Sequence, residues 1–152
     1  NLLVDHFFDA EEMEYVIMQN WNKTVKFDDT VFVLGDFFKK TNSKSVYILD
    51  ILENLNGTKH LILGNHDREI SEDIGFWRVH GFDEIYKYPI IIDNFYILSH
   101  EPLFINSSMP YVNIHGHIHE KNYDHPQYIN VSVEQIDYTP VSLDSIKNKF
   151  KG

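Results

Sequence analysis

Apolar side chains recur at helical spacing in two segments near the start of the chain. In the first, Asp9 precedes Glu12 by three residues, a variant of the capping box, and the apolar positions that follow return every three or four residues. This pattern predicts a helix over roughly residues 10–25. A second run with the same spacing predicts a helix that begins after Asn42 or Ser43 as its cap and stops at Gly57.

Two short apolar runs, residues 30–34 and 59–63, alternate with these helices. Each run leads into a glycine, and the first is β-branched and apolar throughout, which is typical of a strand buried on both faces. A helix between two such strands implies a right-handed parallel crossover, in which functional residues gather at the carboxyl ends of the strands. Asp36 and Asn65 lie at these ends.

The second half of the chain has a different pattern. Residues 90–92 and 95–98 flank Asp93-Asn94 as the two arms of a predicted hairpin, and residues 68–81 leave room for a short helix. Further strand-like runs lie at residues 112–115 and 128–133. We therefore expect a single α/β domain over residues 1–152, with about two helices and six strands.

Composition narrows the chemistry that this domain can support. No apolar run approaches the roughly 20 residues of a membrane-spanning helix, so we expect a soluble, cytoplasmic protein. The absence of cysteine excludes disulfides and thiolate metal sites, so a metal would be held by His, Asn, Asp or Glu. A formal net charge of −10 argues against a surface built to neutralise many nucleic-acid phosphates.

Polar residues of ligand type stand where the strand-like runs stop. They are Asp36, Asn65-His66-Asp67, His100 and His117-Ile118-His119. Singly, each has an ordinary explanation as a turn residue or a packed histidine. Together, oxygen and imidazole donors of this kind suit borderline divalent metals such as Mn²⁺, Fe²⁺, Zn²⁺ or Co²⁺. Glycines precede Asp36, Asn65 and His117, and allow the tight turns and close backbone approach that a ligand site needs.

The order of these blocks carries a family resemblance. Gly35-Asp36, Gly64-Asn65-His66-Asp67, His100 and Gly116-His117-Ile118-His119 match the last four blocks of the metallophosphoesterase pattern. The chain therefore resembles the calcineurin-like metallophosphoesterases, in particular their small bacterial and phage members. The resemblance implies an α/β/β/α sandwich of mixed sheets and a metal-dependent phosphoesterase with a dinuclear metal centre.

The resemblance also implies a role for each matched residue. Asp36 would bridge two divalent metal ions, for which Mn²⁺ is the expected metal. Asn65, His100 and His117 would complete the second metal site, and His119 would belong to the first. The reaction would use a metal-activated water to attack the phosphorus.

Three neighbouring residues would act beside the metals. His66 would stand near the leaving-group oxygen, as general acid or as a transition-state stabiliser. Asp67 would orient the imidazole of His66 by accepting the second ring proton. Arg68 is a candidate contact for a substrate phosphate, with an exposed salt bridge as its alternative.

One block of the family pattern has no counterpart. The family's first strand ends in Asp-x-His, which supplies two ligands to the first metal, and nothing before Asp36 reproduces it. Asp5-His6 has the wrong spacing. We therefore expect the sheet to lack its first strand.

Two functions from different classes remain open. The first is a hydrolase of phosphomonoesters or phosphodiesters, and the second is a catalytically inactive scaffold or interaction protein with the same fold. The intact His66 and second-site residues favour the enzyme. A purely structural zinc domain is disfavoured because such sites are usually rich in thiolates. We expect a small phosphorylated substrate and no membrane partner. A nucleic-acid end stays open, because bound metals would make the site locally positive, and the pattern does not decide the oligomeric state.

Overall fold

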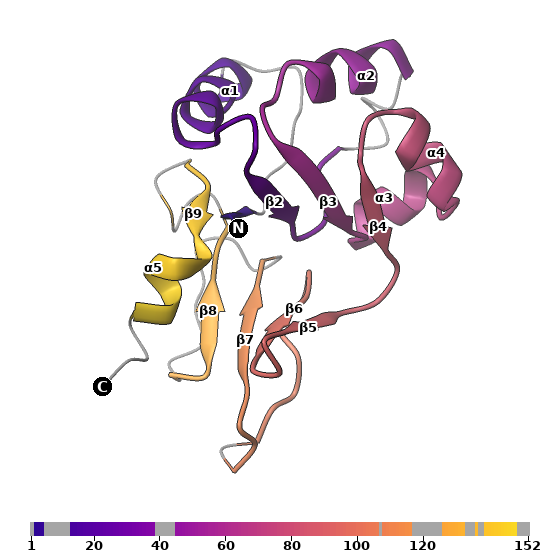
Figure 1. Cartoon of the computed structure of the whole chain (residues 1–152). Coiled ribbons are helices and arrows are strands. Elements are labelled where there is room, and N and C mark those ends of the chain that lie inside the picture. Colours follow the sequence, from indigo (N-terminus) through magenta and orange to yellow (C-terminus); the bar gives the residue numbers. More distant parts are fainter. Residues whose placement is uncertain are drawn as a thin grey trace.

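The computed structural model describes residues 2–4, 13–38, 45–106, 108–116, 126–132, 136 and 139–148, which form two mixed β-sheets with helices (Figure 1). In chain order the elements are β1 (Leu2–Val4), α1 (Met13–Thr24), β2 (Thr30–Val33), α2 (Ser45–Glu53), β3 (Thr58–Ile62), α3 (Asn65–Ile70), α4 (Ile74–Val79), β4 (Glu84–Tyr86), β5 (Ile90–Ile92), β6 (Tyr96–Leu98), β7 (Val112–His115), β8 (Tyr128–Asn130), β9 (Val141–Ser142) and α5 (Leu143–Asn148). This arrangement confirms the predicted α/β class with mixed sheets.

The first sheet has the strand order β4-β3-β2-β1-β9. Its first four strands are parallel and β9 is antiparallel to β1. The second sheet has the order β5-β6-β7-β8, in which only the β5–β6 pair is antiparallel. Parallel neighbours bring their carboxyl ends to one edge, so residues that follow β2 and β3 meet there.

The first sheet separates two apolar clusters. Val31 and Val33 of β2 pack with the helices, including the fully buried Trp21 of α1, whereas Phe32 of the same strand packs toward the second sheet. Successive strand residues point to opposite faces, so a strand covered on both sides must be apolar throughout. Helix α5 joins the second cluster through Leu143 and Ile146. Figure 1 shows α1 and α2 above the first sheet and the second sheet below it.

The strand β1 differs from the sequence-based expectation. We predicted a sheet without its first strand, but Leu2–Val4 lies between β2 and β9, with all three of its residues buried. Three apolar residues buried on both faces show no periodicity, so the pattern of the chain could not reveal them. The predicted helix over residues 10–25 is described from Met13 onward.

No helix in the described part of the chain is both long enough and apolar enough to cross a lipid bilayer.

Candidate metal centre

Three of the predicted ligand residues come together between the two sheets. Asp36 follows β2 and Asn65 begins α3 directly after β3, so both stand at the carboxyl edge of the first sheet. His100 follows β6 of the second sheet. Its Nε2 atom lies 2.9 Å from Oδ2 of Asp36 and 3.1 Å from Oδ1 of Asn65. Three residues far apart in the sequence thus direct atoms that could ligate a metal toward one point.

The tautomer of His100 is set by its other ring nitrogen. Nδ1 donates to the backbone oxygen of Leu34 at 2.7 Å, and a carbonyl oxygen can only accept. A neutral His100 therefore directs the lone pair of Nε2 toward Asp36 and Asn65. This arrangement, in which a second hydrogen bond orients the imidazole, is the usual support for a metal-ligating histidine.

The facing atoms are all acceptors, and this supports a cation at their centre. The carboxylate of Asp36, the Nε2 lone pair of His100 and the inward oxygen of Asn65 repel one another unless a proton or a cation lies between them. Alternatively, the Asn65 amide can turn so that its nitrogen donates to His100 at 3.1 Å and to Oδ2 of Asp36 at 3.0 Å. When the oxygen of Asn65 points inward, the site offers two oxygen atoms and one imidazole nitrogen. These ligand types suit a borderline divalent metal.

The described residues contain no group of three or more His, Asp or Glu side chains placed so that they could hold a metal ion. At the meeting point of Asp36 and His100, the third side chain is the amide of Asn65, which is not one of these three residue types. His117 and His119, the two other predicted ligands, lie outside the described residues. Gly116, the last described residue before them, donates its backbone N–H to the oxygen of His100 at 2.9 Å. Their assignment as ligands stays a prediction.

Asp67 supports the backbone around Asp36. Its fully buried carboxylate accepts backbone N–H groups, and the predicted role of orienting the imidazole of His66 stays a prediction. Oδ2 accepts from Asp36 at 2.6 Å and from Gly64 at 2.9 Å, and Oδ1 accepts from Phe37 at 3.0 Å. Asp36 has a φ of 52°, an uncommon value for a residue with a side chain. Asp67 thus holds the strained loop that presents Asp36.

Two glycines permit the close approach of the two loops. A Cβ atom on Gly64 would stand 2.4 Å from Oδ1 of Asp36, and one on Gly35 would stand 2.7 Å from Nδ1 of His100. Gly35 also has a φ of +90°, which residues with a side chain rarely adopt. Any side chain at either position would push apart the atoms that face the candidate cation.

The acidic groups of the site are electrostatically coupled. With a proton rather than a cation between Asp36 and His100, His100 is charged and donates from Nε2 to Asp36. Burial would raise the pKa of Asp36, but this hydrogen bond and charge, with the N–H of His66, hold that pKa below its ordinary value. Burial raises the pKa of Asp67 to about 6, and the Asp36 carboxylate adds to this rise against the backbone hydrogen bonds. A cation beside Asp36 would favour the ionised form of both carboxylates.

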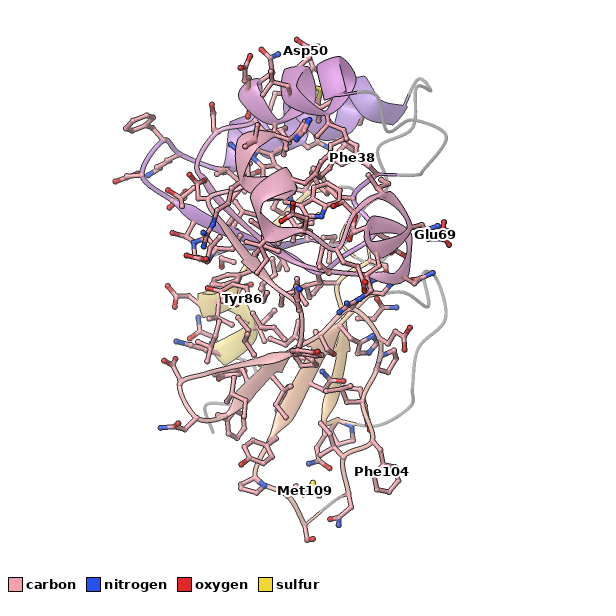
Figure 2. The ribbon with its side chains drawn as sticks, turned by 90° about the vertical axis from the view of Figure 1, so that its right-hand side faces the viewer. Phe38, Asp50, Glu69, Tyr86, Phe104 and Met109 are labelled. Atoms are coloured by element: carbon pink, nitrogen blue, oxygen red, sulfur yellow. The ribbon has the colours of Figure 1, made fainter. Side chains whose placement is uncertain are left out.

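His66 lies at the rim of the site. Its backbone N–H donates to Oδ1 of Asp36 at 2.7 Å, while its imidazole Nδ1 stands 3.7 Å from Oε2 of Glu69. Both side chains are partly exposed on α3, and Figure 2 shows Glu69 pointing outward from that helix. Glu69 therefore places a carboxylate within ion-pair reach of the His66 imidazole.

Arg68 makes the salt bridge that was the alternative to a phosphate contact. Its Nη1 lies 3.2 Å from Oε1 of Glu72, and its Nη2 donates to the backbone oxygen of Lys87. A role in substrate binding therefore stays a prediction.

Asn113 is a supporting residue that the sequence reasoning missed. It is fully buried on β7, and its amide nitrogen donates to the oxygen of Ile97 at 3.0 Å and to Oγ of Ser99 at 2.9 Å. Its Oδ1 accepts from the backbone N–H of Leu103 at 2.8 Å. Asn113 thus fixes both ends of the segment that carries His100. A polar residue between two apolar ones in a buried strand was the available signal.

We expect Asn113→Ala to weaken metal binding without removing a ligand. Losing a residue that orients a ligand typically lowers metal affinity by about 10- to 100-fold, so calorimetric titration with Mn²⁺ should show a loss in that range. Asn56→Ala is the matched control, because Asn56 also donates to backbone oxygens but at the amino end of β3. It should lower the melting temperature and leave Mn²⁺ affinity within about twofold. Unchanged affinity in Asn113→Ala would contradict the positioning role.

The comparisons with known proteins agree with this geometry. The model of the calcineurin-like phosphoesterase family matches residues 6–148. The uncharacterized protein MJ1445 of Methanocaldococcus jannaschii is 36% identical over 149 residues, which covers 92% of this chain and 76% of that protein. The Gene 66 protein of Mycobacterium phage L5 is 37% identical over 59 residues, covering 39% of this chain and 28% of that protein.

A solved structure extends the similarity over nearly the whole chain. The crystal structure of AQ665, a protein of unknown function from Aquifex aeolicus, matches with a TM-score of 0.72 at 28% sequence identity, and 97% of each chain is covered. Because the family model covers most of the sequence, the chain belongs to the calcineurin-like phosphoesterase family.

Proposed function

We propose that this protein is a metal-dependent hydrolase of phosphomonoesters or phosphodiesters. The observation that carries the proposal is the convergence of Asp36, Asn65 and His100, whose inward atoms are all suited to hold a cation. The family to which the chain belongs points to the same class of reaction.

Five residues of the chain would hold two divalent ions. They are Asp36, Asn65, His100, His117 and His119. When bound, such ions lower the pKa of a water molecule and offset the negative charge of the phosphoryl group. We propose Mn²⁺ as the metal, with Fe²⁺, Zn²⁺ and Co²⁺ compatible with the same mixture of oxygen and nitrogen donors.

His66 would protonate the leaving group. Its position at the rim, one residue after Asn65, gives the imidazole access to a substrate without making it part of the donor set. Oε2 of Glu69 lies 3.7 Å from Nδ1 of His66 and would help to orient the imidazole toward the leaving group.

We expect Mn²⁺ to raise the melting temperature of the metal-free protein. At about a hundred times the dissociation constant, ligand binding stabilises a fold by about 2.7 kcal/mol, which corresponds to roughly 5–10 °C for a chain of this size. Ca²⁺ prefers a shell of oxygen ligands and should give a smaller shift. A chelator should reverse the Mn²⁺ effect, as followed by differential scanning calorimetry.

The same preparation tests turnover with bis(p-nitrophenyl) phosphate and p-nitrophenyl phosphate. Mn²⁺-dependent release of p-nitrophenol supports the proposed hydrolase. If Mn²⁺ clearly raises the melting temperature but neither these two esters nor several others are turned over, the result would instead support the non-catalytic scaffold. The absence of any shift would contradict the metal site itself.

A further inference from the structure

A pocket of about 320 Å³ opens directly beside Asn65 and His100. Its walls come from the end of β3, from α3, from the link between β4 and β5, and from the segment that follows β6. The side chains that give it chemical character are Arg68, Lys87, Tyr88, Pro89, Glu101 and Leu103. This volume is at the lower end of the roughly 300–1,000 Å³ typical of small-molecule sites. The pocket adjoins the point at which a phosphoryl group would bind.

Arg68 builds one wall of this pocket. Its guanidinium donates to the backbone oxygen of Lys87 and pairs with Glu72, so it ties the β4–β5 link to α3. Because α3 also carries Asn65, the wall and the candidate metal centre are held by one helix. Figure 2 shows Tyr86, which immediately precedes this link, between the two sheets. Arg68 is therefore a positioning residue whose charge is shared with Glu72.

Lys87 is the cation that remains available in the pocket. Its side chain is exposed, and its ammonium group makes no ion pair or hydrogen bond within the described part of the chain. The pocket lining contains two cationic side chains and one carboxylate, Glu101, although the chain as a whole has a formal charge of −10. Because the charge of Arg68 is shared with Glu72, Lys87 is the cationic side chain of this lining that can face an anionic ligand group.

Tyr88 supplies an aromatic surface at the same place. Its side chain is 74% exposed, so it gains little from folding, and Pro89 and Leu103 line the same pocket. A flat ring that packs against such a side chain gains apolar contact without loss of a buried partner.

We propose that this pocket binds the organic part of the substrate and favours esters in which a flat apolar ring carries a second anionic group. The ring packs against Tyr88 and the second anion faces Lys87. An ammonium group has donors and no acceptor, so it matches an anion better than a neutral hydroxyl. This inference rests on the proposed function, because it requires the phosphoryl group to lie beside Asn65 and His100.

Two phosphonates that cannot be hydrolysed at an ester bond test the pocket without turnover. Phenylphosphonate carries the ring alone, and 4-phosphonobenzoate adds a carboxylate. With Mn²⁺-loaded protein, calorimetric titration should show tighter binding of 4-phosphonobenzoate. Lys87→Gln should reduce that preference by about two- to fivefold, the range expected for an exposed charge pair. The preference should also shrink as salt is added.

Two further variants test whether the preference for 4-phosphonobenzoate depends on the sign of the charge and on its place in the pocket. Glu101→Gln removes the carboxylate of the pocket and should increase the preference for 4-phosphonobenzoate. Lys26→Gln, an exposed lysine in the turn before β2, should leave the preference unchanged. An unchanged preference in Lys87→Gln overturns the assignment of the second anion to this pocket.

Tyr88→Ala tests the ring separately. It should weaken both phosphonates by about fivefold or more and leave their ratio unchanged, since stacking on an aromatic side chain contributes roughly 1–3 kcal/mol. Phe27→Ala is the control, because Phe27 is 92% exposed and lies in a different region. Unchanged affinities in Tyr88→Ala overturn the ring contact. Turnover of phenyl phosphate, measured in parallel, tests the proposed hydrolase independently of these affinities.

Discussion

Asp36→Asn is expected to abolish metal-dependent hydrolysis while leaving the fold intact. Asparagine has the shape of aspartate and tolerates a positive φ, so the loop after β2 keeps its conformation at the observed value of 52°. The oxygen that accepts the N–H of His66 can also be retained. The lost feature is the negative charge that faces His100 and the candidate cation.

The expected loss is larger than for a supporting residue. Removing a group that only orients a ligand weakens metal binding by about 10- to 100-fold, so loss of the charged ligand should exceed 100-fold. Mn²⁺ titration, metal content after dialysis and turnover of bis(p-nitrophenyl) phosphate measure this. Asp50→Asn is the matched control, because Asp50 lies on α2, far from the site in Figure 2. Wild-type Mn²⁺ affinity in Asp36→Asn would refute its assignment as a ligand.

His66→Ala should separate the chemical step from metal binding. General acid catalysis typically contributes about 10²- to 10⁴-fold, so kcat should fall by that factor while Mn²⁺ affinity stays near the parent value. The contact between residue 66 and Asp36 uses the backbone N–H, which alanine retains, and alanine suits the α3 helix. His80→Ala, on the neighbouring helix end, should change kcat by less than about twofold.

The leaving group gives a second measurement of the His66 role. An ester of p-nitrophenol needs little protonation as it departs, so it should lose less activity in His66→Ala than an alkyl ester does. Equal losses for both esters, or loss of bound Mn²⁺ along with activity, would show that His66 holds the structure or the metal instead.

The helices α1 and α2 were predictable because their apolar positions recur with a helical period, and the predicted strands because short apolar runs stop at glycine or turn residues. The sequence indicated β2, β3, β7 and the β5–β6 hairpin, and the positive φ values of Asp93 and Asn94 confirm the tight turn expected there. The elements that were missed, β1, β4, β9 and α5, have between two and six residues. Segments of this length are specified by tertiary contacts rather than by periodicity.

The residues that face the candidate cation could be predicted better than the hydrogen bonds that hold them in place. The blocks around Asp36, Asn65 and His100 named the residues that converge, because strand ends in this fold share an edge. The partner of Asp67 could not be predicted, since three backbone N–H groups leave no trace in the sequence. The hydrogen bonds of Asn113 were also missed, although its place between the apolar Val112 and Ile114 of a buried strand was a usable signal.

The position of β1 has a consequence for how the chain folds during synthesis. Within the described residues, one side of β1 pairs with β2 and the other with β9, with Leu2 opposite Ser142 and Leu3 opposite Val141. A nascent chain therefore carries an unpaired strand edge until nearly its last described residues have left the ribosome. Such an edge is open to pairing with other chains. Closing it joins segments far apart in sequence, which makes this the slow and aggregation-exposed step of folding.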